Sequence, residues 1–276
     1  PGRSGTYTKK SIQNYQIILK NYPNYPRVDE ALFFLAFMLN DVGQEKEALE
    51  KYQQLVKTFR ESTFVPDSHN AIGEYYFNNN NAFKALQAYK QAARYKDSKI
   101  YTFALYKMGW CYYNVGEFGT AIETMKDLVS ETDRRMRESG EQAGISLKEE
   151  ALRDLVLFFS EEGDLQAAKE YFTRYGEKRY YRKMLARLGN IYVDQGKNDL
   201  AVQTYRELIA DNPYASDNPD HQNSIIKAFQ GRDKFDEANE EINKLVDVYG
   251  RESRWAQENK DNRSAGKEAE RLIEKN

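Results

Sequence analysis

Apolar residues recur along this chain with the period of an amphipathic helix, and the pattern as a whole repeats every 33 to 47 residues. Each repeat has an alanine near the start of a predicted helix, namely Ala48, Ala85, Ala121, Ala168, Ala201 and Ala238. Five residues earlier stands a residue type that tolerates the left-handed conformation at a helix end. These are Gly43, Asn80, Gly116, Gly163, Gly196 and Asp233. The pattern predicts six helix–turn–helix hairpins.

The helix before each turn carries one large and one small residue at fixed positions. Nine residues before the alanine lie large apolar or aromatic residues, namely Leu39, Tyr76, Tyr112, Phe159, Tyr192 and Phe229. Twelve residues before it lie mostly small residues, namely Ala36, Gly73, Gly109, Val156, Gly189 and Ile226. Small residues let two helices approach, and the large residue fills the space beside the crossing. Because one hairpin cannot bury its apolar stripe alone, neighbouring hairpins are expected to stack.

These positions resemble the tetratricopeptide repeat family, in which each unit pairs a helix A with a helix B. The resemblance is clearest where Gly43 precedes the segment 46–52, and in 188–213 with its Leu-Gly-Asn-Ile-Tyr start. It implies an all-α solenoid wound as a right-handed superhelix. The expected units span about 27–62, 64–98, 100–133, 147–180, 181–214 and 219–250.

Three segments depart from the regular repeat. Residues 6–25 resemble the helix B of a unit whose helix A is missing, so we take the chain for a piece of a longer protein. The long spacing between two units predicts an insertion at 131–146, either a loop or a helix extension with a loop. Residues 251–276 are highly charged, and we expect them to form a polar capping helix that then frays.

Composition and motifs provide no basis for catalysis. Two histidines (His69 and His221, each expected just before a helix) and one cysteine (Cys111) are too few for a zinc cluster or a disulfide framework. No phosphate-binding glycine loop, nucleophile elbow, zinc-protease motif or EF-hand loop occurs. We therefore predict a protein that is not an enzyme, with no catalytic residues, no metal site and no cofactor, and with Cys111 as a small core residue.

The family resemblance implies a binding surface on the concave wall, which helices A line. The residues carried over to this groove are Phe33, Phe34, Phe37, Asn40, Asn70, Glu74, Phe77, Tyr106, Lys107, Trp110, Tyr113, Asn114, Arg153, Arg187 and Asn190. Aromatic anchors with a few polar groups are typical of surfaces that bind a protein or peptide. The alternative is that several of these rings pack against a neighbouring helix B, with Phe33 and Phe37 the first candidates. A clamp for C-terminal carboxylates is not expected, because phenylalanines replace the Lys and Asn of its first helix.

One basic segment suggests an alternative function, the binding of RNA. Arginines and lysines alternate with tyrosines over residues 174–187, a composition that can hold phosphates and stack bases. The same residues are also ordinary at a turn between helices. With 41 cationic and 43 anionic side chains the net charge is −2, so the chain as a whole lacks the electrostatic footprint of a nucleic-acid-binding protein.

The leading hypothesis is a scaffold that binds a protein partner, within a bacterial cell-envelope assembly or motility complex. Repeat spacings above the usual 34 residues and the Tyr-Pro ending of 21–23 resemble the repeats of envelope lipoproteins. That resemblance implies a periplasmic location, and the missing native N-terminus leaves room for an outer-membrane tether. A cytoplasmic adaptor is the alternative. No run reaches the length of apolar residues that spans a bilayer.

Overall fold

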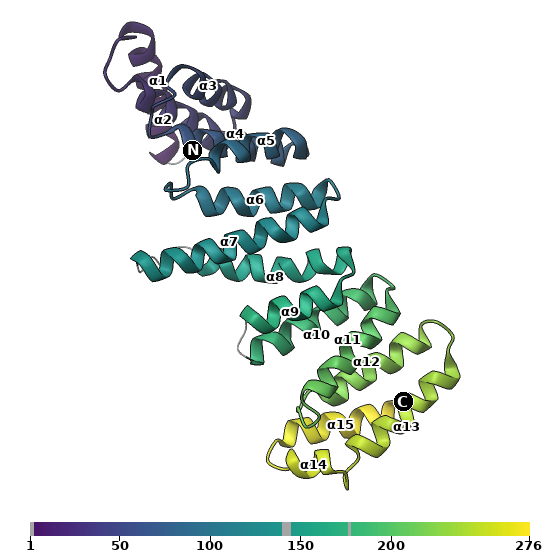
Figure 1. Cartoon of the computed structure of the whole chain (residues 1–276). Helices are drawn as coiled ribbons and strands as arrows, with labels where there is room; N and C mark the ends of the chain where they lie inside the picture. Colours follow the sequence, from purple (N-terminus) through teal and green to yellow (C-terminus); the bar gives the residue numbers. More distant parts are fainter. Residues whose placement is uncertain (1–2, 140–144, 176–177) are drawn as a thin grey trace. The chain divides into compact units, whose positions relative to one another are not determined.

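The computed structural model describes residues 3–139, 145–175 and 178–276, and every regular element in these residues is an α-helix (Figure 1). The predicted all-α repeat fold is confirmed. The chain divides into two compact units, Pro1–Leu152 and Arg153–Asn276, which we call unit 1 and unit 2 and describe separately.

Unit 1 is a series of antiparallel helices in which each packs against the next. Its helices are α1 (Arg3–Asn21), α2 (Val28–Asp41), α3 (Glu45–Thr58), α4 (Val65–Asn78), α5 (Ala82–Ala92), α6 (Tyr101–Asn114) and α7 (Phe118–Ser139). Helices α2, α4 and α6 are helices A, and α3, α5 and α7 are helices B. The core is continuous through the stack, because Ile12, Leu39, Tyr52, Ile72 and Ala88 come from five successive helices and form one buried cluster.

Unit 2 continues the same hairpin pattern. Its helices are α8 (Ile145–Glu162, which begins in unit 1), α9 (Leu165–Tyr175), α10 (Lys178–Asp194), α11 (Asn198–Asp211), α12 (Asn218–Gln230), α13 (Phe235–Tyr249), α14 (Arg254–Glu258) and α15 (Arg263–Lys275). Helices α8, α10 and α12 are helices A, and α9, α11 and α13 are helices B. From α9 to α13 each helix packs against the next.

All six predicted turn residues have a left-handed backbone, which confirms the assignment of the turns. Their φ angles range from 55° at Asn80 to 80° at Gly43 and Gly116. In five of the turns, the amide of the following residue donates a hydrogen bond to the carbonyl of the large helix-A residue, for example from Gln44 to Leu39 at 2.8 Å and from Asn81 to Tyr76 at 2.8 Å. This bond satisfies a helix-end carbonyl that would otherwise lack a partner.

The small helix-A residues face the large helix-B residues at very short range. A Cβ atom added to Gly73 would lie 2.5 Å from a ring carbon of Tyr89, and one added to Gly189 would lie 2.8 Å from the ring of Tyr205. Real Cβ contacts are longer than this, so only glycine fits at these two crossings.

The insertion expected at 131–146 is, in its first part, a continuation of α7 to Ser139. The Arg135 guanidinium donates hydrogen bonds to the carbonyls of Lys96 (2.5 Å) and Ser98 (3.2 Å), so it ties the extension to the loop before α6. Residues 140–144 of the insertion lie outside the described residues.

The tail differs from the prediction of one polar helix that frays. It forms two helices, α14 and α15, at the end of the chain (Figure 1). Helix α15 continues to Lys275, and its Ala265, Ala269 and Leu272 are buried in a cluster with residues of α12 and α13. Trp255 of α14 is only 2% exposed, and its Nε1 donates to the Ala215 carbonyl at 2.8 Å. The high charge of the segment predicts a solvated helix, whereas its few apolar residues, Trp255 and Leu272 among them, are buried and decide its packing.

Candidate functional site

The first helix A of unit 1 carries a cluster of aromatic rings. Phe33 stacks on Phe64 with centroids 4.7 Å apart and meets Phe34 edge-on at 5.5 Å. Both phenylalanines are half-buried in this cluster, whereas Phe37 is 56% exposed and Asn40 is also exposed. The alternative that Phe37 packs in the core instead of lining the groove is therefore wrong. For Phe33 the same alternative is confirmed in part, because its ring packs against Phe64 and Phe34 and is only partly exposed.

A charged cluster joins the next two helices A. The Lys107 ammonium of α6 lies 3.0 Å from a carboxylate oxygen of Glu74 in α4. It also lies 4.7 Å from the ring centroid of Phe77 and 5.4 Å from that of Phe103, within the range of a cation–π contact. Only 16% of the Lys107 side chain is exposed. The positive charge on this surface is thus neutralised by Glu74 and covered by two rings.

Glu74 also accepts a hydrogen bond from a buried tyrosine of the helix B in the same hairpin. The Tyr89 hydroxyl of α5 donates a hydrogen bond to its carboxylate. Burial and this hydrogen bond both raise the pKa of Tyr89, which therefore stays protonated as a donor. In unit 2 the Tyr205 hydroxyl donates in the same way to Asn190 Oδ1 at 2.7 Å. In both hairpins the polar helix-A residue satisfies a buried tyrosine, a role that the sequence analysis missed although the 15-residue spacing is common to both pairs.

Helix α6 places its predicted residues side by side. The Trp110 and Tyr113 rings lie 5.4 Å apart, and Tyr113 meets Phe118 of α7 at 5.4 Å. Tyr106, Trp110 and Tyr113 are half-buried and Asn114 is exposed. We call Phe37, Phe77, Lys107, Trp110 and Tyr113 the aromatic face of unit 1.

Asn70 differs from its polar neighbours on α4. It is half-buried, and its Oδ1 is buried without a hydrogen-bond partner among the described residues. Among the predicted groove residues of unit 1, and within the part of the chain that the structure describes, Asn70 alone has a side-chain polar atom that is shielded from solvent and lacks a hydrogen-bond partner.

In unit 2 the predicted polar residues lie on two helices A. Arg153 is exposed on α8, and Arg187 and Asn190 are exposed on α10. The latter two border an open hollow of about 460 Å³, which is lined by Arg182, Lys183, Ala186, Arg187, Asn190 and Asp217. Lys183 and Arg187 stand one helical turn apart on the same side of α10.

The basic segment 174–187 leaves little tyrosine surface in solvent where the structure describes it. Tyr171, just before it, and Tyr181 are both buried, and Tyr175 is half-buried against Tyr171 at 4.7 Å. Residues 176–177, and the side chains of 178–180, lie outside the described residues. Rings that are buried cannot stack on bases, so the described part of this segment offers little to RNA.

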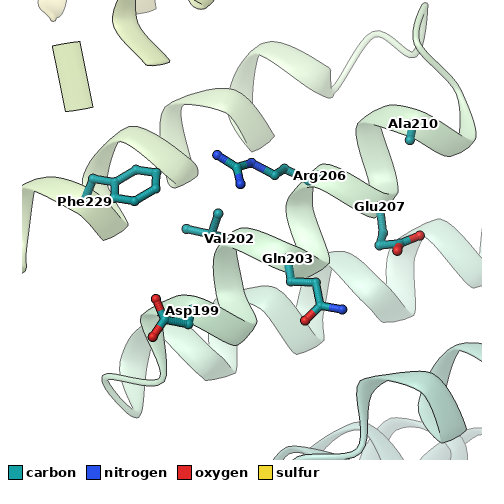
Figure 2. Close-up of a pocket in the computed structure, with 7 residues that line it drawn as sticks. All are labelled: Asp199, Val202, Gln203, Arg206, Glu207, Ala210 and Phe229. Atoms are coloured by element: carbon teal, nitrogen blue, oxygen red, sulfur yellow. The ribbon is translucent and has the colours of Figure 1, made fainter. Parts of the chain in front are cut away.

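A second hollow of unit 2 lies on the helix-B side (Figure 2). It is lined by Asp199, Val202, Gln203, Arg206, Glu207 and Ala210 of α11 and by Phe229 of α12. Figure 2 shows the Arg206 guanidinium extended toward the Phe229 ring, 6.0 Å from its centroid. Arg206 also pairs with the buried Glu241 at 2.8 Å, while Asp199 pairs with Arg232 and Glu207 with Lys169. Every charged side chain that lines this hollow already has a counter-ion within the protein.

The histidine and cysteine side chains, which could bind a metal or react as a thiol, lie within helices of the repeat. Within the described residues no group of histidine, cysteine and acidic side chains is arranged to hold a metal ion. Cys111 is fully buried, and this burial raises the pKa of its thiol to about 12. Both histidines lie inside helices, His69 in α4 and His221 in α12, which corrects the expectation that they precede them. No helix among the described residues is long and apolar enough to cross a bilayer.

The fold and these surfaces define a protein built from stacked helical hairpins of the A–B type. Two segments, residues 103–131 and 184–213, match family models described as tetratricopeptide repeats. The chain therefore contains tetratricopeptide repeats, in agreement with its helical-hairpin fold.

No curated protein matches the chain, whereas several solved structures are similar to it. MamA is 23% identical, with 62% of this chain and 82% of MamA covered and a TM-score of 0.47. A tetratricopeptide repeat protein from Parabacteroides merdae is 18% identical, with 89% and 97% covered and a TM-score of 0.47. PilF of Pseudomonas aeruginosa is 16% identical, with 85% and 97% covered and a TM-score of 0.41.

Proposed function

We propose that this protein is a non-catalytic scaffold that binds a partner protein through the aromatic face of unit 1. Tetratricopeptide repeats generally mediate protein–protein interaction, and two of them match here. The observation that carries the proposal is the presence of large aromatic rings on helices A that are not fully covered: Phe37 of α2 is 56% exposed, and Trp110 and Tyr113 of α6 lie side by side and are partly exposed. Large aromatic side chains are the residue type that most often anchors a protein interface.

The electrostatics of the same face support a protein partner. Lys107 is neutralised by Glu74 and lies against two rings, so the centre of the face is apolar with one compensated ion pair. Such a surface gains from burial of apolar area and has no net charge to attract a polyanion. The partner segment that fits it is one with aliphatic or aromatic anchors.

A double substitution tests this proposal. Replacing Trp110 and Tyr113 by alanine should abolish capture of the partner on the immobilised protein, because both ring anchors are lost. Phe83→Ala is the matched control, since Phe83 is 70% exposed but belongs to the helix B α5. The helical circular-dichroism signal must stay unchanged in all variants. Equal capture by the double variant and the wild type would contradict the proposal.

We propose the periplasm as the compartment and a cell-envelope assembly or motility complex as the setting. The long repeat spacings and the Tyr-Pro ending of 21–23 support this placement, and a cytoplasmic adaptor is the alternative. The two differ in the coding sequence upstream of Pro1. A lipoprotein signal with its lipobox cysteine is the expected finding, whereas an upstream region with no export signal would favour the adaptor.

A further inference from the structure

Two successive pairs of helices A in unit 1 differ at one equivalent position. Between α4 and α6, the Lys107 side chain lies against the Glu74 carboxylate and the Phe77 ring. Between α2 and α4 the same position of the repeat is Ala71, which stands 36 residues before Lys107. Ala71 is itself partly exposed, so no neighbouring side chain seals the place that a lysine fills one repeat later. We call this place the Ala71 site.

A buried tyrosine next to the Ala71 site lacks the hydrogen-bond partner that its counterpart has. In the α4–α5 hairpin the Tyr89 hydroxyl donates to Glu74. Tyr52 of α3 is the residue equivalent to Tyr89, but Phe37 stands at the position of Glu74. Tyr52 is only 5% exposed, and its hydroxyl has no hydrogen-bond partner among the described residues. A buried polar group in this state costs free energy that a suitable ligand would recover.

Asp67 brings a negative charge to the same place. It lies half-buried in the first turn of α4, where the positive end of the helix dipole favours an acid. Its carboxylate forms no ion pair within the part of the chain that the structure describes, and burial raises the pKa of Asp67. Burial and, to a smaller extent, the charge of Asp67 raise the pKa of Tyr52 to about 12, so the carboxylate lies near the phenol. This charge has no counter-ion from unit 1.

Asn70 supplies a further acceptor. It follows Asp67 by three residues, so the two side chains lie on the same side of α4. Its Oδ1 is shielded from solvent and accepts no hydrogen bond from any described residue. The Asp67 carboxylate, Asn70 Oδ1 and the Tyr52 oxygen are thus three acceptors that no donor satisfies. An ammonium group has three donor hydrogens and no acceptor, and so matches this set.

We infer that the Ala71 site binds the ammonium group of a lysine side chain in the partner protein. The inference rests on the proposed function and specifies one contact of the partner segment. The register places the exposed Phe37 ring where Glu74 meets Lys107, so this ring can cover the aliphatic part of the incoming side chain. An acidic group does not fit the site, because the charge of Asp67 would repel it.

The probe is a fluorescent peptide of sequence Leu-Ser-Lys-Ser-Leu, acetylated and amidated so that the lysine carries its only charge. A second peptide has norleucine, which keeps the aliphatic part but lacks the ammonium group. The wild type should bind the lysine peptide about tenfold or more tightly than the norleucine peptide at low salt, because only lysine makes charge-assisted hydrogen bonds. Asp67→Asn should reduce this preference to about twofold or less, since the charge of the site is removed.

A second variant fills the site from within the protein. Ala71→Lys places a lysine at the position of Lys107, from which its own ammonium group can reach Asp67. Binding of the lysine peptide should therefore be lost, while the helical circular-dichroism signal stays unchanged. Glu50→Gln is the matched control, because it removes an exposed carboxylate from the helix B α3. It should leave the preference for the lysine peptide within about twofold of the wild type.

Three results would overturn the inference. They are a wild type that does not prefer the lysine peptide, a loss with Glu50→Gln as large as that with Asp67→Asn, and undiminished binding by Ala71→Lys. The two proposals fail separately, because neither peptide carries an aromatic anchor and none of the substituted residues belongs to the aromatic face of unit 1. Failure here leaves the capture experiment with Trp110 and Tyr113 to decide the proposed function.

Discussion

Replacing Trp255 by alanine should lower the free energy of unfolding of unit 2 by about 3–5 kcal/mol, the range for removing a buried aromatic ring. Trp255 is 2% exposed and meets Tyr249 edge-on with centroids 5.4 Å apart. It belongs to the cluster that joins α12, α13 and α15, which includes Ile226 and Leu272. The loss therefore affects the attachment of the whole tail, and chemical denaturation followed by circular dichroism measures it.

The milder substitution Trp255→Phe separates packing from hydrogen bonding. It keeps most of the apolar volume but removes the Nε1 donor to the Ala215 carbonyl. Leaving that carbonyl without a partner should cost about 1–3 kcal/mol, less than the alanine variant. If Trp255→Ala unfolds at the same denaturant concentration as the wild type, the tail does not contribute to the stability of unit 2 and its description as a packed cap is wrong.

Adding a single methyl group at Gly73 should destabilise unit 1 by about 1–3 kcal/mol, the range for overpacking a core. The new Cβ would lie 2.5 Å from the Tyr89 ring. Tyr89 cannot move aside easily, because it is fully buried and its hydroxyl is held by Glu74. Steric strain therefore outweighs the gain of about 0.5–1 kcal/mol that alanine normally gives over glycine in a helix.

Gly266 provides the matched control on α15. It also lies inside a helix, but a Cβ added there would meet no atom within 4 Å. Gly266→Ala should therefore stabilise the protein by about 0.5–1 kcal/mol through helix propensity alone. A stabilised Gly73→Ala variant in the same thermal unfolding series would show that the α4–α5 crossing is looser than described.

The repeat fold could be predicted from the sequence because its determinants are local and recur. A left-handed turn residue depends on the backbone at one position, so Gly43 and Asp233 could be assigned without knowledge of the rest of the structure. The small residue at Gly73 and the large one at Tyr89 are set by helical register, which the period of the sequence fixes. Because the pattern recurs in six hairpins, each position of the repeat can be compared across six examples in one chain.

The candidate site could be predicted only in part, because its chemistry depends on which side chains meet across helices. The register placed Glu74 and Lys107 on helices A, but the ion pair between them depends on the reach of two side chains from neighbouring repeats. The same register does not reveal that Asn190 is held by Tyr205. For Phe37, a hydrophobic residue in an apolar helix, the sequence could not show whether a neighbour covers it.

The central claim is that the aromatic face of unit 1 is the surface that holds the partner, and calorimetric titration of the purified partner tests it most directly. We expect the Trp110→Ala, Tyr113→Ala double variant to bind about 30-fold or more weakly than the wild type, as for the loss of an interface hot spot. Phe83→Ala should bind within about twofold of the wild type, since scattered surface aromatics contribute little. An unchanged dissociation constant for the double variant, or a large loss with Phe83→Ala instead, would contradict the claim.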